Sequence, residues 1–466
     1  MSQLYYLSAL ELRKLYLNRE LSPVEVTKVL LNRIEQLNPR LNAYITVTQE
    51  LALQQARSAE AAYLRGENIP LLAGIPTSLK DLTPTQGIPT TYGSLIHKNS
   101  PPPCFNATIV DRLYQAGIVL LGKTNTPEFG WKGDTSNLIV GPTHNPWKHG
   151  YTAGGSSGGA AAAMAAGLGA LAQGSDGAGS IRIPSSFCGT YGFKPSWGLV
   201  PIYPASAVEL MSHLGPITRT VRDAAFMLTV MAGADPRDPR SISTDIDYLS
   251  ASEESIAGLR IAWSPDLGYA SVTDEIRQIT TKAAMKFEEL GCHVEEVNPG
   301  IPDPWDEIVH IIWSSSYAAM YRQKTDNISE LADPGLTAVI NEGKRFSAID
   351  VANANMERQR YYQSMHRFMQ KYDLLLTPTL PISAFKAGEN YPVQVDQGRT
   401  QYLNWTPFTY PFNITGQPAA TVPCGFDHNG IPVGLQIIGN WRDDVTVFRA
   451  SAAFEAVSPW EIEALP

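Results

Sequence analysis

The sequence predicts an α/β protein in which a large mixed, mostly parallel β-sheet is sandwiched between α-helices. Two observations favour this class. A helical pattern leads directly into a buried apolar strand at residues 107–123, and the same order recurs between residues 259 and 297. Alternating units of this kind build mostly parallel sheets that are covered by helices. With 466 residues, 44% hydrophobic and only 17% charged, the chain can bury a large core.

The N-terminal part is predicted to form two outer helices. Ser8 and Glu11 have the spacing of a capping box, and the run Ser22–Glu25 begins the second helix with a proline in its first turn. The second helix places apolar side chains on one face, namely Val26, Val29, Leu30 and Ile34. Both helices are therefore expected to pack against the outside of the core.

The two helix-and-strand units have clear boundaries. ATIVDRLYQAG is predicted to be a helix that stops at Gly117, and IVLLG follows it as a buried strand. In the later unit, LRIAWS and CHVEEV are the strands, and apolar residues at helical spacing between them predict a helix. These residues are Ile276, Ile279, Ala283, Phe287 and Leu290.

The remaining segments complete the predicted order. Gly154–Ser186 is rich in Gly, Ser and Ala around an eleven-residue apolar helix, AAAAMAAGLGA, and ADPRDPRS at 234–241 is a loop. Residues 300–370 are helix-rich and are predicted to form a helical cap or subdomain within a single domain spanning 1–466. Toward the end come the strands LLLTPT, AATVPCGF and IPVGLQIIG, the last two as a hairpin, and then a closing helix.

Composition disfavours several classes of partner. A formal charge of −9 provides no cationic field for nucleic acid or anionic lipid, and no segment is long and apolar enough to span a bilayer. The four cysteines lie far apart without a CxxC pair, and no His, Cys or carboxylate cluster has metal-ligand spacing. We therefore expect a cytoplasmic protein with no metal and no cofactor; whether it forms a homo-oligomer stays open.

The Gly/Ser-rich segment admits three simple interpretations, and each makes a demand that the sequence does not meet. A phosphate loop needs Lys and then Ser or Thr after its second glycine, but Ala160 follows Gly159. A nucleophile elbow centred on Ser157 needs a buried strand before it, and KHGYTA is not one. A flexible linker would not contain an apolar helix. What remains is a catalytic serine whose base is not histidine, and Lys80 in GIPTSLKDL is the candidate base.

Several segments in order resemble the blocks of the amidase-signature family. They are GIPTSLKDLTPTQGIPTT, LLGKTNTPEFG, GGSSGGAAAAMAAGL and GSDGAGSIRIPSSFCGTYGFKP, and the similarity continues through LGPITRTVRDAA, LLLTPTLP and FNITGQPAATVPCGF. The resemblance covers nearly the whole chain and is greatest to the free-standing bacterial amidases. It implies the amidase-signature fold. It also implies hydrolysis of the carbon–nitrogen bond of a linear small-molecule amide, through a serine acyl-enzyme.

The resemblance also implies a Ser–Ser–Lys triad. Lys80 matches the base, Ser156 matches the bridging serine that follows a cis peptide, and Ser180 matches the nucleophile. A lysine can accept the serine proton only when it is neutral, which burial favours. Asp81 follows Lys80 directly, and we expect its side chain to point elsewhere, toward backbone groups.

Further residues are expected to support the triad. Consecutive N–H groups of Gly177, Ala178 and Gly179 can point at one oxyanion, although Ala178 stands where the family commonly has glycine. Ser157 is expected to support the site by hydrogen bonding. Asp176 and Arg182 are expected to form a paired buried brace beside the loop.

Two alternatives stay open. One is the A subunit of a glutamyl-tRNA(Gln) amidotransferase, which transfers ammonia and would bring the only nucleic-acid partner. Against it, this chain has Ile183 and LMSHLGP where that protein carries Gln and a Ser-Leu-Asp-Gln run. The other is a binding scaffold without catalysis, which the retention of all three triad candidates disfavours. Aromatic residues such as Trp313, Tyr317, Trp405, Phe408 and Tyr410 could line an acyl pocket, but aromatic residues more often belong to the core, and we do not assign them to the site.

Overall fold

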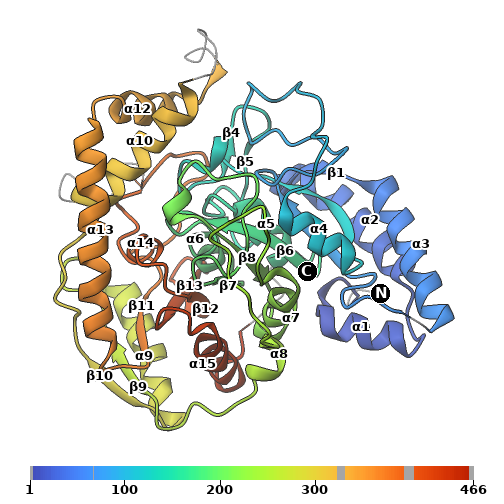
Figure 1. Cartoon of the computed structure of the whole chain (residues 1–466). Coiled ribbons are helices and arrows are strands. Elements are labelled where there is room, and N and C mark those ends of the chain that lie inside the picture. The colour runs from blue at the N-terminus through green and yellow to red at the C-terminus, as the bar shows by residue number, and fades with distance from the viewer. Residues whose placement is uncertain (1–3, 67, 323–330, 393–402, 461–466) are drawn as a thin grey trace.

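An eleven-stranded mixed sheet forms the centre of the fold (Figure 1). The computed structural model describes residues 4–66, 68–322, 331–392 and 403–460. In spatial order the strands are β1 (Tyr44–Val47), β3 (Val119–Thr124), β2 (Pro76–Lys80), β6 (Leu171–Asp176), β8 (His213–Thr218), β7 (Tyr191–Lys194), β12 (Ala419–Phe426), β13 (Pro432–Gly439), β11 (Leu374–Pro378), β9 (Arg260–Trp263) and β10 (His293–Glu296). A separate two-stranded sheet pairs β4 (Ser136–Asn137) with β5 (Gly141–Pro142).

The predicted α/β class and the large mixed sheet are confirmed, but parallel pairs do not predominate. Of the ten pairings in the large sheet of the described chain, four are parallel and six antiparallel. The two units behind the prediction are indeed parallel, because a helix carries the chain back between β2 and β3 and between β9 and β10. The expectation of a mostly parallel sheet extended that pattern to the other strands, which include the antiparallel hairpin β12–β13.

Helices surround the sheet. The α-helices are α1 (Ala9–Leu17), α2 (Pro23–Leu41), α3 (Gln49–Arg65), α4 (Thr108–Gln115), α5 (Gly158–Ala165), α6 (Arg182–Cys188), α7 (Val221–Met231), α8 (Tyr248–Ala251), α9 (Asp274–Glu289), α10 (His310–Tyr321), α12 (Pro334–Gly343), α13 (Ala348–Met369), α14 (Pro411–Ile414) and α15 (Asp444–Val457). Short helical turns are η1 (Leu4–Tyr6), η2 (Glu128–Gly130), η3 (Glu209–Met211) and η4 (Trp305–Val309).

The side chains of β7 show that helices cover both faces of the sheet. Phe193 stacks on Phe448 of α15 with ring centroids 4.1 Å apart. A Cβ added at the neighbouring Gly192 would instead lie 2.2 Å from Oγ of Ser185 in α6. Because successive residues of a strand point to opposite faces, α6 and α15 lie on opposite sides of the sheet. Gly192 is required where α6 approaches the strand so closely.

The predicted N-terminal caps are confirmed. Ser8 and Glu11 form a reciprocal capping box at α1, and Ser22 and Glu25 form another at α2. The predicted ends of the first unit are confirmed as well, since α4 is followed by Gly117 at φ +86° and then by β3.

The apolar helix of the Gly/Ser-rich segment is shorter than expected. It was predicted over eleven residues, but α5 covers Gly158–Ala165 and the chain then turns at Gly167, whose φ is +65°. Gly167 ends the helix in a left-handed conformation that glycine adopts without a steric penalty. Residues 168–170, the end of the Ala-rich run, form the irregular connection that leads into β6.

The helix-rich part between residues 300 and 370 is present as η4, α10, α12 and α13, and Figure 1 shows the three α-helices together on one side of the molecule. Its role as a cap or subdomain, and the assignment of 1–466 as one domain, remain predictions. The loop at 234–241, the hairpin β12–β13 and the closing helix α15 agree with the sequence-based expectations.

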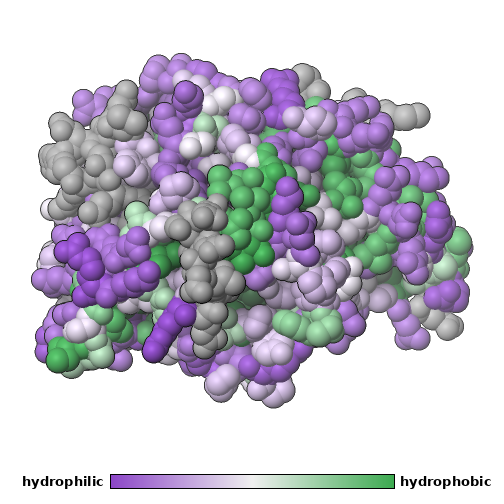
Figure 2. All heavy atoms as spheres, turned by 90° about the horizontal axis from the view of Figure 1, so that it is seen from above, coloured by the Kyte–Doolittle hydropathy of each residue, from purple (hydrophilic) through white to green (hydrophobic). Residues whose placement is uncertain are grey.

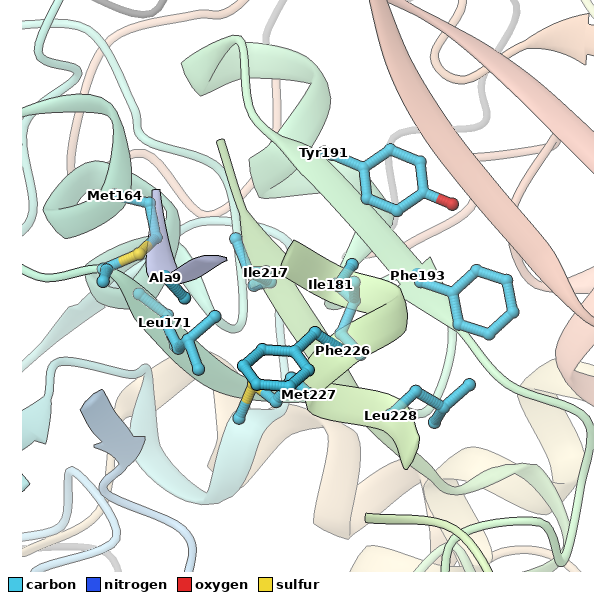
Figure 3. Close-up of a cluster of buried hydrophobic side chains, with 14 of the residues drawn as sticks. Ala9, Met164, Leu171, Ile181, Tyr191, Phe193, Ile217, Phe226, Met227 and Leu228 are labelled. Atoms are coloured by element: carbon cyan, nitrogen blue, oxygen red, sulfur yellow. The ribbon is translucent and has the colours of Figure 1, made fainter. Parts of the chain in front are cut away.

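The hydrophobic core fixes the centre of the sheet, on which the site is built. Figure 3 shows side chains from β6, β7, β8 and α7 packed together with Met164 of α5 and Ala9 of α1. Each fully buried large apolar side chain stabilises the fold by about 1.5–3 kcal/mol. On the face seen in Figure 2 most of the surface is hydrophilic, with a hydrophobic patch near its centre. Within the described ranges, no helix is both long and apolar enough to cross a membrane.

Candidate active site

The candidate site lies where β2 and β6 end. These two strands are parallel neighbours, with Leu79 paired to Gln173, so the residues that follow them emerge at the same edge of the sheet. Lys80 is the last residue of β2, and Asp176 is the last residue of β6. The serines of GGSS stand immediately before α5, and Ser180 stands between β6 and α6. The topology therefore brings together residues that are up to 100 positions apart.

Lys80 is completely buried and is surrounded by hydroxyl groups. Its Nζ lies 2.7 Å from Ser156 Oγ, 2.9 Å from Ser157 Oγ and 3.0 Å from Ser175 Oγ. Burial holds the pKa of Lys80 well below its ordinary value, and the charge of Asp176 opposes this only in part. The neutral amine is thereby favoured, which can donate two hydrogens and accept one.

Asp81 points away from Lys80. Its Oδ2 accepts hydrogen bonds from the Thr91 N–H at 3.0 Å and from the Thr91 Oγ1 at 2.5 Å. The nearest cation to its other oxygen is Lys123, whose Nζ lies 3.9 Å from Oδ1. Burial lowers the pKa of Lys123 to about 8, while Asp81 raises it. Asp81 thus interacts with Thr91 and with Lys123, and it forms no ion pair with Lys80.

Ser156 and Ser180 both open onto one cavity of about 340 Å³. They are 2% and 5% exposed, and the peptide bond before Ser156 is cis. The chain before α5 is tied to the loop before α6, because the Ser157 N–H donates to the Ser180 carbonyl over 3.1 Å. Gly130 adjoins the same point: a Cβ there would lie 3.1 Å from Ser156 Oγ.

Ser157 does not line the cavity that Ser156 and Ser180 share. Its hydroxyl accepts a hydrogen bond from the Lys80 amine and donates one to the Ser175 carbonyl over 3.1 Å. The side chain is fully buried. The chain before Ser157 is irregular apart from isolated bridges, so the strand that a nucleophile elbow requires is absent from the described residues 147–156. These contacts fit a supporting residue.

The loop from Asp176 to Ser180 is shaped by the Asp176 carboxylate. Its Oδ1 accepts the Gly179 N–H over 2.6 Å, and its Oδ2 accepts the Ile181 N–H over 3.2 Å. Gly179 has φ +120°, and a Cβ there would lie 2.5 Å from Thr409 Oγ1, so only glycine fits. Because the Gly179 N–H already donates to Asp176, Gly177 and Ala178 remain as the candidates of the predicted oxyanion run.

Asp176 and Arg182 form a bidentate ion pair that is fully buried. Arg182 Nε lies 2.9 Å from Asp176 Oδ2, and Nη2 lies 3.0 Å from Oδ1. The guanidinium also donates to the Thr409 carbonyl, the Gln436 side chain and the Asn413 side chain. Burial alone would raise the pKa of Asp176, but Arg182 and Asn413 outweigh it and hold that pKa well below its usual range. The pair connects the Ser180 loop to β13 and to residues 409–413.

The rest of the cavity wall is largely aromatic and apolar. It includes Tyr92, Phe129, Tyr203, Trp313, Tyr317 and Met320. Of the five aromatic candidates from the sequence, Trp313 and Tyr317 lie on this wall, whereas Trp405, Phe408 and Tyr410 are buried in hydrophobic clusters. His213 also lines the cavity; its Nδ1 lies 2.8 Å from the Met211 carbonyl, and burial keeps its pKa well below the ordinary value.

Some residues of the site were missed by sequence reasoning. Ser175 gives Lys80 a third hydroxyl contact, and Asn413 joins the Asp176–Arg182 pair. Both lie inside segments that resemble the family blocks, GSDGAGS and FNITGQPA, which was the available signal. Phe129 and Gly130 belong to η2 and lie at the end of another such block, LLGKTNTPEFG, whereas Tyr92 lies just beyond the block that contains Lys80. Among the described residues no group of three or more His, Cys, Asp or Glu side chains is arranged to hold a metal ion.

Comparison with known proteins gives the same picture along the whole chain. A family model described as Amidase matches residues 25–448. The acylamidase of Rhodococcus erythropolis is 42% identical over 462 residues, covering 98% of this chain and 96% of that protein. The A subunit of the glutamyl-tRNA(Gln) amidotransferase of Moorella thermoacetica is 38% identical over 482 residues, covering 97% of each.

Solved structures are similar over the same extent. A bacterial aryl acylamidase of the amidase-signature enzymes superposes with a TM-score of 0.91 at 36% identity, covering 98% of this chain and 97% of that one. A 6-aminohexanoate cyclic dimer hydrolase, in complex with its substrate, superposes with a TM-score of 0.88 at 28% identity and 98% coverage of both chains.

Proposed function

The chain belongs to the amidase-signature family and is an amidase, and we propose that it cleaves its amide through an acyl-enzyme on Ser180, with Ser156 and Lys80 as the proton path. The observation that carries this proposal is the buried Lys80 amine at 2.7 Å from Ser156 Oγ, beside a cavity that Ser156 and Ser180 share.

In the first step the Ser180 oxygen attacks the amide carbonyl. Its proton passes to Ser156, and the Ser156 proton passes to the neutral Lys80 amine. The tetrahedral intermediate then collapses: the carbon–nitrogen bond breaks, and a proton returns along the same path to the leaving nitrogen. Water repeats the sequence on the ester, releasing the carboxylic acid and regenerating Ser180.

The negative oxygen of the intermediate needs donors that are already in place. We assign this role to the N–H groups of Gly177 and Ala178, with Gly179 in a holding role through its bond to Asp176. Loss of one oxyanion donor in a hydrolase typically costs about 3–4 kcal/mol of transition-state stabilisation. Asp176 and Arg182 support the site by fixing this loop, and Ser157 by orienting the Lys80 amine.

The cavity favours a neutral amide with an apolar group. Among the described residues that line it, none is Lys or Arg, and Asp176 is already paired with Arg182. The carboxylate of a free amino acid such as glutamine would lie there without a cation, which is unfavourable in a partly closed site. This supports release of ammonia or an amine to water over the second candidate, the amidotransferase function.

Two assays test the proposal. A fluorophosphonate should label Ser180, as read by peptide mass spectrometry, and Ser180→Ala should take up no label. Hydrolysis should then be measured on benzamide, on acetanilide and on glutamine with and without an ammonia-accepting aminoacyl-tRNA. Labelling at Ser157, or turnover restricted to glutamine in the presence of tRNA, would count against the hydrolase. Absence of both labelling and turnover would favour a binding scaffold.

A further inference from the structure

Glu128 is a buried carboxylate for which the proposed mechanism has no use. It begins η2, it is 1% exposed, and no lysine, arginine or histidine among the described residues forms an ion pair with it. A carboxylate left unpaired in such a place is unfavourable unless hydrogen bonds compensate it. Its position therefore needs an explanation in terms of its hydrogen-bond partners.

Three separate segments donate hydrogen bonds to Glu128. The Ser94 hydroxyl lies 2.5 Å from Oε1 and the Tyr321 hydroxyl 3.3 Å from the same oxygen. The Asp333 N–H donates to Oε2 over 2.6 Å. These donors come from the loop after β2, from the last residue of α10 and from the residue before α12. One carboxylate thus joins α10 and the start of α12 to the loop that follows β2.

The joined segments carry the aromatic wall of the cavity. Tyr92 and Phe129 stack with ring centroids 5.6 Å apart, and the Phe129 N–H donates to the Tyr92 carbonyl over 2.8 Å. From α10, the Tyr317 hydroxyl donates to the Phe129 carbonyl over 2.9 Å. Phe129 directly follows Glu128, and Tyr92 is two residues before Ser94.

Both stacked residues have an unfavourable backbone conformation. The φ of Tyr92 is +56° and that of Phe129 is +50°, in the left-handed region that bulky residues rarely adopt. Such a conformation persists when the surrounding contacts enforce it, and it is found most often where a site must be held in shape. Ser94 follows Tyr92 by two residues and Glu128 directly precedes Phe129, so the hydrogen bond between Ser94 and Glu128 joins the chain segments that contain the two stacked residues.

The wall reaches the reacting centre through Trp313 of α10. A Cβ added to Gly177 would lie 3.1 Å from Cζ3 of this indole, so the ring stands against the proposed oxyanion run. A shift of the wall would therefore change both the room for an apolar group and its position relative to Ser180.

We propose that Glu128 is a positioning residue that holds the aromatic wall in place and so determines the preference for substrates with a ring. This inference rests on the proposed function for its substrate, a neutral amide, and goes beyond it in assigning specificity to a residue that does not line the cavity. Glu128 acts through Tyr92, Phe129 and α10.

The test compares two primary amides with the same leaving group, benzamide and acetamide. In Glu128→Gln the amide oxygen can still accept the Asp333 N–H, but the amide NH2 then faces the Ser94 and Tyr321 hydroxyls, which must accept where they donated to a charged carboxylate. We expect kcat/KM for benzamide to fall by about 10- to 100-fold, mainly through KM, and the benzamide-to-acetamide ratio of kcat/KM to fall by about tenfold. Tyr321→Phe and Ser94→Ala each remove one hydrogen bond and should shift the ratio in the same direction by less. These two variants replace Glu128→Gln in the test if that protein does not fold.

Asp223→Asn is the matched control. Asp223 is also a buried carboxylate that accepts backbone N–H groups, those of Ala9 and Leu10, but it lies in α7 and does not line the cavity. It should lower stability while leaving the ratio unchanged. Equal losses on both amides in the Glu128, Tyr321 and Ser94 variants, or an unchanged ratio in all three, would overturn the inference.

A second readout separates this inference from the proposed function. Benzamide binding to Ser180→Ala, measured by calorimetry, should weaken by about tenfold when Glu128→Gln is added. If wild-type protein hydrolyses no amide but this difference in binding is found, the proposed function fails and the positioning role stands. If hydrolysis is found and the binding difference is not, the positioning role fails alone.

Discussion

At the scale of single residues, the proposed mechanism depends on the charge of Lys80. Burial disfavours its ammonium form and the Asp176 charge favours it, with burial the larger effect, so the pKa lies well below the ordinary lysine value. The fraction of neutral amine therefore rises with pH in a range where an exposed lysine would still be protonated. Three serine hydroxyls, those of Ser156, Ser157 and Ser175, form hydrogen bonds with this amine.

The first prediction concerns the rate–pH profile. We expect kcat/KM for benzamide to rise with pH along a limb centred well below about 10.4, as Lys80 loses its proton. Lys80→Ala should abolish both the rate and this limb. Lys80→Arg should be equally inactive, because a guanidinium stays protonated and accepts no proton. Substantial activity in Lys80→Arg with an unchanged profile would show instead that a permanent charge is what the site requires.

The second prediction concerns Ser156. Its hydroxyl is the link between Lys80 and the cavity that contains Ser180. Ser156→Ala should lower kcat by roughly 10³-fold or more, because members of a proton path act as a unit. Thermal unfolding should change little, which distinguishes lost chemistry from lost structure. Near-normal turnover in this variant would mean that Lys80 takes the proton from Ser180 without a relay.

At the scale of elements, the buried pair Asp176–Arg182 fixes the loop between β6 and α6. Arg182 has hydrogen bonds to residues from β13 and from the segment around α14, so the loop is attached to two other parts of the chain. Removing one partner leaves an uncompensated charge in the interior, which is more destabilising than the pair itself is stabilising.

The third prediction follows from this difference. Arg182→Met should lower the free energy of unfolding by about 3–5 kcal/mol, as measured by urea denaturation. The matched control is Glu253→Gln, which breaks the exposed pair with Arg222, where both side chains are more than half exposed. That change should stay within about 0.5 kcal/mol. Similar losses in the two variants would contradict a special role for burial.

The fourth prediction concerns the junction of α1 and α7. Asp223 accepts the Ala9 N–H over 2.9 Å and the Leu10 N–H over 3.2 Å, and burial raises its pKa from 3.8 to about 6. An acid whose folded-state pKa is raised stabilises the protein below its unfolded-state pKa, and this stabilisation is lost as pH rises through about 6.

Between pH 4 and 6, the free energy of unfolding should therefore decline more in the wild type than in Asp223→Asn. The difference between the two proteins over this interval should reach at most about 3 kcal/mol, from about 1.36 kcal/mol per pKa unit. Denaturant titrations at several pH values measure it. Parallel curves would mean that Asp223 has the same affinity for protons in the folded and unfolded chain.

At the scale of the whole molecule, the sequence predicted those features that depend on local patterns. The capping boxes at Ser8 and Ser22, the stop at Gly117 and the hairpin β12–β13 were found as expected, because caps, glycine turns and strand periodicity are local properties. The balance of parallel and antiparallel pairs was wrong, since strand order depends on how distant segments meet. The end of α5 was misplaced because an Ala-rich run continues through Gly167 into the approach to β6.

The candidate site divides in the same way. Lys80, Ser156, Ser180, Asp176 and Arg182 were identified from segments that resemble family blocks, and the structure brings them together around one edge of the sheet. The direction of the Gly179 N–H toward Asp176, the third hydroxyl on Lys80 and the aromatic wall could not be read from the sequence. Each depends on contacts between loops that are far apart in the chain.

The central claim is that amide cleavage passes through an ester on Ser180. The most direct measurement is acid quenching during turnover of an anilide, followed by mass spectrometry of the intact protein and of its peptides. We expect the peptide that contains Ser180 to gain the mass of the acyl group. The acylated fraction should be larger when hydroxylamine, which cleaves esters, is omitted, and no acylated peptide should form in Ser180→Ala. An acyl group on Ser157, or full turnover by Ser180→Ala, would contradict this account.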